Sequence, residues 1–430
     1  MKNKIAAILQ SQYFIIIIGL LGVLNYFLGF FILFTLILAV YTILIYIYKI
    51  SKINLVLVFI MGLISLNYDK INMNYSDLSY FIIYSGFIFI GVLMIIDLII
   101  NFEKTKFDKK FILIAVFVLS VFELSILFNL DKNYSLVMIY EQLKLLGCFL
   151  IFLYFKNFKK NDEDISIYFI YMYMFVLLQI TIEVLTSSNI KDTLLNMKNF
   201  NLSWCKYSTH LSMLLCFLSV FFIYFYKKTN KGLYLVPIVI TFIMAIIFKC
   251  RASIIAYSII VIGIVVYLFI SNTNKKKVMY DVLLFVLVPF CLIIIILSFY
   301  ILEDIINSLL NVGLAPHGRI ELIEKGLHDF INNITFGRGY GSQLVYLKDE
   351  FHVYNYHNIY IQVLATTGIL GFFTFFGALG YMIYKVDKKN VYNFVFLLFV
   401  GYLLLHGFFD TTFFTYRVNI IFSLAIIQLK

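Results

Sequence analysis

Residues 5–48 form one continuous stretch without a charged side chain. A helix needs about 20 predominantly apolar residues to cross the hydrocarbon core of a bilayer. A single helix over this whole stretch would be roughly 65 Å long, about twice the thickness of that core. The stretch also lacks the alternation of apolar and polar residues that a membrane β-strand requires. We therefore predict two membrane-spanning helices here, separated by a turn near Asn25 and Gly29.

Long apolar runs continue along the rest of the chain. Of all residues, 63% are hydrophobic and 13% are charged, whereas charged residues make up about a quarter of an ordinary soluble domain. We therefore predict an all-α, polytopic helical membrane protein with about 14 transmembrane helices (12–14), forming a single membrane domain over residues 1–430. The predicted spans are 5–24, 28–48, 53–68, 78–100, 111–129, 134–155, 165–187, 204–226, 232–248, 252–270, 280–301, 357–384, 392–409 and 412–429.

Lysine residues mark every second connection between the predicted spans. These lysine-rich connections lie at 49–52, 104–110, 156–160, 227–231, 275–277 and 385–389. Basic residues accumulate in cytoplasmic loops, so this parity predicts that both the N-terminus and the C-terminus are cytoplasmic. The same loops explain the net charge of +11, and we expect no nucleic-acid partner.

One predicted connection, residues 302–356, is much longer than the others and falls on the extracytoplasmic side. Loops of this length in a compact protein are usually functional or disordered. Within it, apolar residues recur at helical spacing at Ile320, Ile323, Leu327, Phe330 and Ile334. This pattern predicts an amphipathic helix over 319–333, lying on the outer leaflet.

The four arginines have an uneven distribution. Arg251, Arg319, Arg338 and Arg417 all fall at extracytoplasmic or embedded positions, whereas the cytoplasmic loops use lysine. Lysine suffices as a topology signal, but the planar guanidinium can bind a phosphate or carboxylate through two parallel hydrogen bonds. The outer face is therefore predicted to bind an anion. The alternative is that these residues anchor helix ends.

Ionisable residues near the outer ends of the late spans point to the same face. His406 and Asp410 are spaced i,i+4, so on one helix face the carboxylate could orient the imidazole. Because a charge within the membrane is costly, such groups usually pair or line a cavity. A purely structural role remains the alternative for each of them.

His357 lies where the long outer connection meets the next predicted span. The positive end of the helix dipole disfavours an imidazolium there, so we expect a neutral ring that could act as a general base. The alternative is a capping or interfacial histidine. We found no cysteine pair or acidic cluster suited to a metal on this face, and we expect neither a metal nor another cofactor.

Several of these segments together resemble the O-antigen polymerase/ligase superfamily, which comprises Wzy-type polysaccharide polymerases and WaaL-type O-antigen ligases. Residues 357–371 (HNIYIQVLATTGILG) resemble its HNxYLQxLxxxGxxG motif. Residues 250–253 (CRAS) are similar to its SRG-type motif, and Gly318-Arg319 and 336–339 (FGRG) to elements of its large outer loop. Asp410 is similar to an acidic residue in a late span. The chain departs from the pattern at Ala252, where glycine is usual, and in the Thr-Thr pair before the glycine of the first motif.

The resemblance implies a metal-independent glycosyltransferase that acts on undecaprenyl-diphosphate-linked sugars. It would lie in the bacterial cytoplasmic (inner) membrane, with its active site facing the extracytoplasmic side. His357 would be the catalytic base. The expected substrate-binding residues, for diphosphate and glycan, are Arg251, Arg319, Arg338, Asp410, His406 and Arg417.

Within this family we favour a polymerase that joins repeat units into capsular polysaccharide, exopolysaccharide or O-antigen. The expected partners are a lipid-linked oligosaccharide donor and acceptor and membrane lipid, with a flippase and a chain-length regulator as candidates. One alternative is a ligase-type transferase, which moves a lipid-linked glycan to another acceptor. A lipid-linked oligosaccharide flippase is the alternative from another class of protein.

Overall fold

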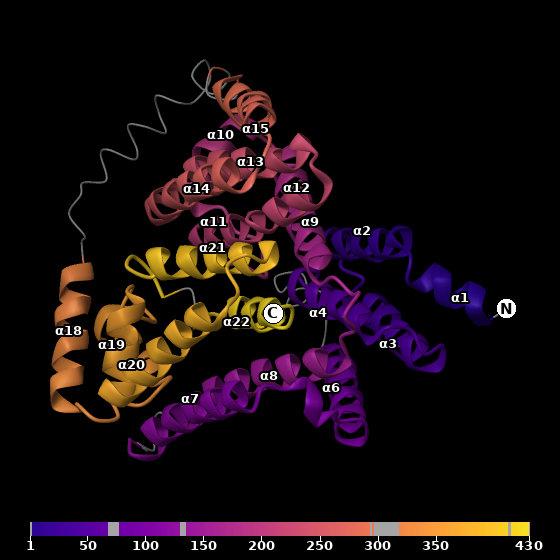
Figure 1. The fold of residues 1–430 in the computed structure, drawn as a ribbon. Coiled ribbons are helices and arrows are strands. Elements are labelled where there is room, and N and C mark those ends of the chain that lie inside the picture. The colour runs from indigo at the N-terminus through magenta and orange to yellow at the C-terminus, as the bar shows by residue number, and fades with distance from the viewer. Residues whose placement is uncertain are drawn as a thin grey trace. The chain divides into compact units, whose positions relative to one another are not determined.

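The computed structural model describes residues 2–67, 77–129, 135–292, 295, 318–411 and 414–429. Within these ranges the regular structure is helical, apart from one isolated bridge between Leu202 and Cys205 (Figure 1). The prediction of an all-α protein is therefore confirmed for the part of the chain that is described.

Among the described residues, 6 helical segments are long and apolar enough to cross a membrane. They lie in α7 (Lys109–Leu127), α8 (Ser135–Phe158), α9 (Ser166–Leu185), α11 with α12 (Ser208–Ser219 and Phe221–Thr229), α14 (Arg251–Ser271) and α20 (Ile359–Lys385). Shorter apolar segments lie in α2 (Gln12–Leu28), α3 (Phe31–Ile47), α4 (Leu55–Ile64), α6 (Asp77–Ile100, here its part Ser85–Ile100), α13 (Val236–Ile247), α21 (Val391–His406) and α22 (Tyr416–Ile426).

These helices coincide with 13 of the 14 spans listed from the sequence, so a polytopic membrane protein is supported while the count of 14 stays a prediction. The remaining span, 280–301, begins in α15 (Lys275–Val282) and continues through a π-helical turn at Leu283–Leu287. Most of its second half lies outside the described residues, as do residues 302–317 of the long connection.

The turn predicted within residues 5–48 is present. Helix α2 ends at Leu28, and Gly29 follows with φ 82°, donating its backbone N–H to Asn25 O. Glycine suits this position because a positive φ strains residues that carry a Cβ. The sequence did not predict a second break before α2, where the Ser11 side chain accepts a hydrogen bond from Phe14 N and caps the helix after α1 (Lys2–Leu9).

The chain divides into two compact units, each made of separate stretches of sequence. Unit 1 comprises Met1–Glu103, Leu153–Arg251 and Tyr267–Ile305, and unit 2 comprises Lys104–Phe152, Ala252–Val266 and Ile306–Lys430. Helix α14 (Arg251–Ser271) therefore contributes its first residue and its last turn, from Tyr267 on, to unit 1, and the part between them to unit 2.

In unit 1, a charged pair is enclosed by further polar groups. Lys52 Nζ lies 2.6 Å from Asp97 Oδ1, and the same carboxylate accepts hydrogen bonds from Asn101 and from the Tyr154 hydroxyl. Asp97 is only 8% exposed. This pairing satisfies a carboxylate that would be costly to leave unpaired inside a membrane.

In unit 2, α7 packs against α20, and α18 (Arg319–Asn332) packs against the first part of α20 (Figure 1).

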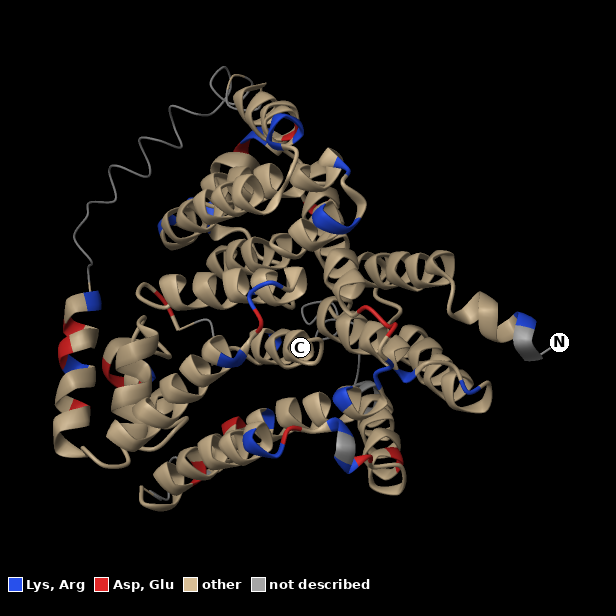
Figure 2. Ribbon diagram, viewed as in Figure 1, with Lys and Arg blue, Asp and Glu red and all other residues tan. Residues whose placement is uncertain are grey.

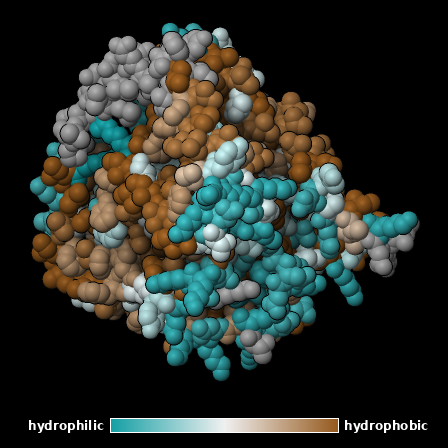
Figure 3. All heavy atoms as spheres, turned by 45° about the horizontal axis from the view of Figure 1, so that its top comes forward, coloured by the Kyte–Doolittle hydropathy of each residue, from teal (hydrophilic) through white to brown (hydrophobic). Residues whose placement is uncertain are grey.

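Figure 2 shows that charged residues lie mainly at helix ends and connections, whereas α18 carries both signs along its length. On the face drawn in Figure 3, hydrophobic side chains occupy much of the surface. An apolar surface of this kind is expected for helices that face lipid.

Candidate active site

His357 stands immediately before α20 in an unusual backbone conformation, with φ 50°. Its neighbour Asn358 is the N-cap of the helix, because the Asn358 side chain accepts hydrogen bonds from Tyr360 N and Ile361 N at 2.9 and 3.1 Å. The cap is therefore Asn358 and not His357, while an interfacial histidine stays the alternative to a general base. Asn358 satisfies the free amides, and the His357 side chain is left for another role.

The His357 ring faces a carboxylate. Its Nδ1 lies 3.5 Å from Asp410 Oδ1, and the two side chains are 33% and 11% exposed. We expected Asp410 to share a helix face with His406, and this was wrong. Helix α21 ends at His406, and Asp410 follows in the next turn, with its backbone N–H donating to His406 O.

Backbone contacts hold this part of unit 2 together. Ile359 N, at the start of α20, donates to Gly407 O, just after α21. His406 is buried, and its ring lies 5.6 Å from that of Tyr402. The Tyr402 hydroxyl in turn donates to Ser253 Oγ, in the segment that resembles the SRG-type motif. The structure thus brings His357, His406 and Asp410 to one end of α20 and α21.

The Asp410 carboxylate is close enough to orient the His357 ring. A carboxylate beside Nδ1 favours the tautomer that carries its proton on that nitrogen, which leaves the Nε2 lone pair available as a base. The 3.5 Å separation is long for a hydrogen bond, but such contacts commonly shorten when a substrate binds.

A second cluster in unit 2 surrounds Arg338. Its guanidinium donates to Asp329 Oδ1 at 3.2 Å and lies 3.8 Å from the ring of Tyr346, in α19 (Gln343–Phe351). Asp329 is only 4% exposed, and Lys325 Nζ lies 3.8 Å from the same oxygen. The buried carboxylate thus has positive charge on two sides, as its burial requires.

Tyr356 links this cluster to His357. Its hydroxyl donates to Asp329 Oδ2 at 2.7 Å and also contacts the hydroxyl of Tyr346. Burial raises the pKa of the Tyr356 phenol, and the neighbouring Tyr346 and Asp329 raise it further. The phenol therefore stays protonated as a donor. Because Tyr356 immediately precedes His357, Asp329 connects Arg338 to the backbone that positions the histidine.

The glycines of the FGRG segment and of the 357–371 motif meet each other. Helix α20 is interrupted at Gly368, with φ 67° and ψ −167°. Beside this interruption, Arg338 N and Gly339 N donate to Ala365 O and Thr366 O, at 2.8 and 2.9 Å. A Cβ on Gly337 would collide with the backbone of Thr366, and one on Gly368 with that of residue 335. These two glycines therefore permit direct contact between backbones.

The remaining arginines occupy separate positions. Arg319 is the exposed first residue of α18 and follows Gly318, which has φ 77°. Arg417 is the second residue of α22, and its guanidinium lies 4.5 Å from the ring of Tyr416. Arg251 opens α14 and belongs to unit 1. The described contacts thus connect Arg338 to the His357 region, while the expected anion-binding roles of all four stay predictions.

The comparison with known families agrees with these features. Residues 236–376 match the O-antigen ligase family. This finding confirms the resemblance to the O-antigen polymerase/ligase superfamily that the sequence motifs indicated. A search of curated proteins found no match.

The segment that matches the O-antigen ligase family includes Arg251, Arg319, Arg338 and His357, and it ends before His406. Together with the apolar helices, the match suggests a multi-pass membrane enzyme that transfers glycans and acts on lipid-linked oligosaccharides.

Some residues of the O-antigen ligase-like segment were not singled out from the sequence. The buried carboxylate of Asp329 and the phenol of Tyr356 are examples, as is Gln362, whose side-chain oxygen accepts from Tyr356 N at 3.1 Å. Asn358 and Gln362 were visible within the HNxYxQ motif, but their structural roles were not. Nothing in the sequence indicated the role of Asp329 except its place in the predicted amphipathic helix.

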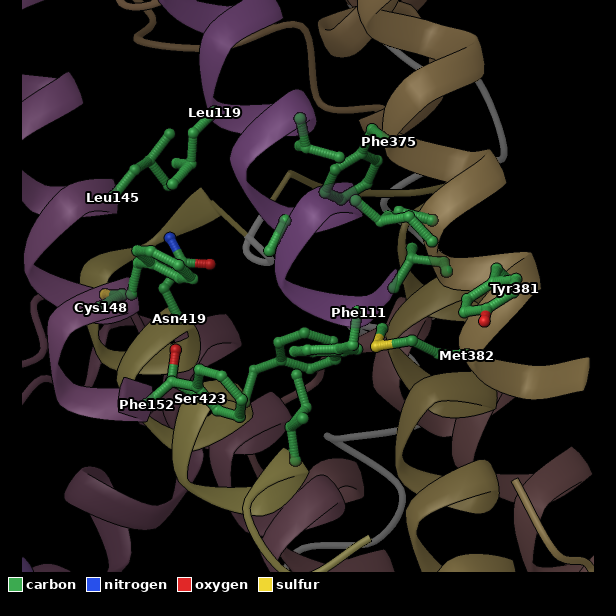
Figure 4. A pocket seen from close by; sticks show the side chains of 18 residues that line it. Phe111, Leu119, Leu145, Cys148, Phe152, Phe375, Tyr381, Met382, Asn419 and Ser423 are labelled. Atoms are coloured by element: carbon green, nitrogen blue, oxygen red, sulfur yellow. The ribbon is translucent and has the colours of Figure 1, made fainter. Parts of the chain in front are cut away.

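Unit 2 also contains an apolar pocket, between α7, α8, α20 and α22 (Figure 4). Its lining includes Phe111, Phe152, Phe375 and Met382, and Asn419 adds an amide. Met382 lies near the end of α20, about 35 Å along the helix from its start. The pocket lacks a charged lining residue among the described side chains, so its chemistry suits hydrocarbon and not glycosyl transfer.

Proposed function

We propose that this chain is a polysaccharide polymerase. It would join undecaprenyl-diphosphate-linked oligosaccharide repeat units into a capsular polysaccharide, an exopolysaccharide or O-antigen. The proposal places the protein in the bacterial cytoplasmic membrane, with the reacting groups on the extracytoplasmic side. The observation that carries it is the His357–Asp410 pair, whose histidine lies in the segment matched by the O-antigen ligase family.

In the proposed reaction, a hydroxyl of the acceptor glycan attacks the anomeric carbon of the donor glycan. The bond from that carbon to the diphosphate oxygen breaks, and undecaprenyl diphosphate leaves with the bonding electrons. His357 Nε2 takes the proton of the attacking hydroxyl, and Asp410 stabilises the imidazolium that forms. The imidazolium then releases its proton to water. One glycosidic bond is formed for each glycosyl phosphate bond broken.

The leaving diphosphate gathers negative charge as this bond breaks, so hydrogen-bond donors aimed at it lower the barrier. Arg319 is exposed and could meet a diphosphate without first leaving a buried position. Arg338 has five N–H donors, of which the Asp329 contact uses one. We assign the diphosphate to Arg251, Arg319 and Arg338, and keep Asp410, His406 and Arg417 as further residues for binding the diphosphate or the glycan.

Two other functions remain as alternatives. A ligase-type transferase would use the same base and the same donor diphosphate but a different acceptor, and the family match is equally compatible with it. A flippase moves a lipid-linked oligosaccharide without breaking a bond, so it has no use for a general base. For a polymerase, a flippase would supply the substrate, and a chain-length regulator would act on the product.

Deletion of the gene distinguishes the three functions. We expect the deletion strain to lose surface polymer and to accumulate single lipid-linked repeat units at the outer face of the membrane, as a missing polymerase requires. Full-length polymer still attached to the lipid would identify a ligase, and repeat units retained at the inner face would identify a flippase. A plasmid copy of the wild-type gene should reverse the defect, whereas a copy carrying His357→Ala should not.

A further inference from the structure

Helix α18 presents different surfaces around its circumference. Successive residues of a helix are turned by about 100°, which puts Leu322, Gly326 and Asp329 on one side, and all three are buried. A Cβ on Gly326 would collide with the side chain of Ile361 in α20. This side therefore packs against the protein.

A second side of α18 is apolar and exposed. Ile320, Leu327 and Ile331 are 56%, 40% and 65% exposed, and Ile334, just after the helix, is 52% exposed. We call these four residues the apolar sector. Apolar side chains that share one exposed side of a helix usually mark a contact with a partner or with a membrane.

The next side around the helix is polar. Glu321 and His328 are both exposed there, and the exposed Glu324 lies at the border with the apolar sector. Leu327 and His328 are adjacent in sequence and are turned by about 100° from each other, so the change from apolar to polar is abrupt. An apolar sector beside a charged one is the pattern of a helix at a boundary between lipid and water.

The apolar sector continues directly into the exposed side of α20, a candidate membrane span. Ile369 N donates to Ile334 O at 2.8 Å, which joins the C-terminal end of the sector to α20. At and after this contact in α20, Ile369, Leu370 and Phe373 are 37%, 42% and 68% exposed. Exposed apolar residues on a membrane span face lipid, and the sector extends this lipid-facing surface onto α18.

The turn after α18 does not depend on water for its hydrogen bonds. Six consecutive backbone amides, from Gly337 to Ser342, each donate to a protein acceptor. The acceptors are Asn333 O, Ala365 O, Thr366 O, Ser125 Oγ, Gln343 Oε1 and Gly339 O. Irregular backbone can lie at membrane depth only when protein groups satisfy it in this way.

We propose that the apolar sector of α18 is a lipid-contacting surface. It rests in the hydrocarbon of the leaflet nearest His357, while Glu321 and His328 face water and Glu324 lies at the boundary. The sequence predicted an amphipathic helix on the membrane, and the structure adds which side meets lipid and how α20 anchors it. Lipid is the partner that the sector fits, because the sector is continuous with a membrane span. The proposal does not depend on the transferase reaction.

Tryptophan fluorescence tests this with neighbouring positions. The single native tryptophan, Trp204, is 1% exposed, so the parent protein gives a constant baseline. Leu327→Trp and His328→Trp would be placed in phosphatidylcholine vesicles whose acyl chains carry bromine near the headgroup. We expect bromine to quench the added emission of Leu327→Trp and aqueous iodide to quench that of His328→Trp. Ile331→Trp, on the same side of α18, should also lose emission to bromine.

The proposal fails if iodide, and not bromine, quenches Leu327→Trp and Ile331→Trp, because the sector would then face water. It also fails if both variants are shielded from both quenchers, because another protein surface, such as a second copy, would then cover the sector. Size-exclusion profiles like that of the parent show that each variant is folded. Having two variants keeps the test decisive if one of them misfolds.

Discussion

At the scale of single residues, His357 is set apart by its surroundings. The adjacent Asn358 caps α20, so replacing His357 removes no hydrogen bond on which the helix start depends. We expect His357→Asn and His357→Ala to be inactive to a similar degree, by about 10²–10⁴-fold, because neither side chain can accept the proton. Polymer formation from purified lipid-linked repeat units measures this, and thermal unfolding should be unchanged.

The exposed histidine five residues earlier, His352, provides the matched control. His352→Ala should retain full polymer formation, since no part of the proposed site uses it. Near-normal turnover in His357→Asn, combined with failure in His357→Ala, would show that the ring orients other groups and is not the base.

Arginine variants separate binding from structure at the same scale. Arg319→Lys keeps the charge but loses the bidentate fork, and two lost contacts of about 1.5–3 kcal/mol each imply a decrease in rate of roughly a hundredfold or more. Because Arg319 is exposed, the Arg319→Lys protein should unfold at the same temperature as the parent protein. Arg338→Lys should lower both activity and unfolding temperature, because it also loses the stacking on Tyr346 and the bond to Asp329. An unchanged unfolding temperature for Arg338→Lys would contradict this.

At the scale of elements, the interruption of α20 at Gly368 determines how the preceding segment docks. Gly368→Ala and Gly337→Ala each place a Cβ against backbone, at a positive φ that costs of order 1–3 kcal/mol in addition to the collision. We expect both variants to unfold at lower temperature and to lose activity. Gly377→Ala is the control, because this helical position of α20 has open space around it. Equal stability of all three variants would show that the interruption is dispensable.

The sequence predicted helices better than helix ends. Apolar periodicity and length located the spans, and Gly29 marked a break because its conformation is a local property. The end of α21 at His406 was missed, since Phe408 and Phe409 continue the apolar run. The approach of Asp410 to His357 depends on contact between the start of α20 and the turn after α21, as in the bond from Ile359 N to Gly407 O, and no local pattern encodes such a contact. The role of Asp329 was missed for the same reason.

At the scale of the whole molecule, the lysine distribution predicts which loops lie on which side of the membrane. The test uses a Cys291→Ser background, because Cys291 is the exposed cysteine and the other four are buried. Asp349→Cys and Thr273→Cys then introduce new thiols at exposed positions. We expect an impermeant maleimide to label Asp349→Cys in intact cells and Thr273→Cys only after permeabilisation. The reverse result would put His357 on the cytoplasmic side.

The contacts of Gly337 also bear on the order in which the protein assembles during synthesis. Its carbonyl accepts from Asn129, 208 residues earlier in the chain, and its neighbours pair with Ala365 and Thr366, which emerge from the ribosome later. Helices α7 and α8 are therefore synthesised about two hundred residues before the segment that they contact in unit 2. Contacts this distant in sequence form slowly. In a chain arrested before α20, the helices of unit 2 would lack their packing partners. Such a chain would be open to degradation by the quality-control proteases of the membrane.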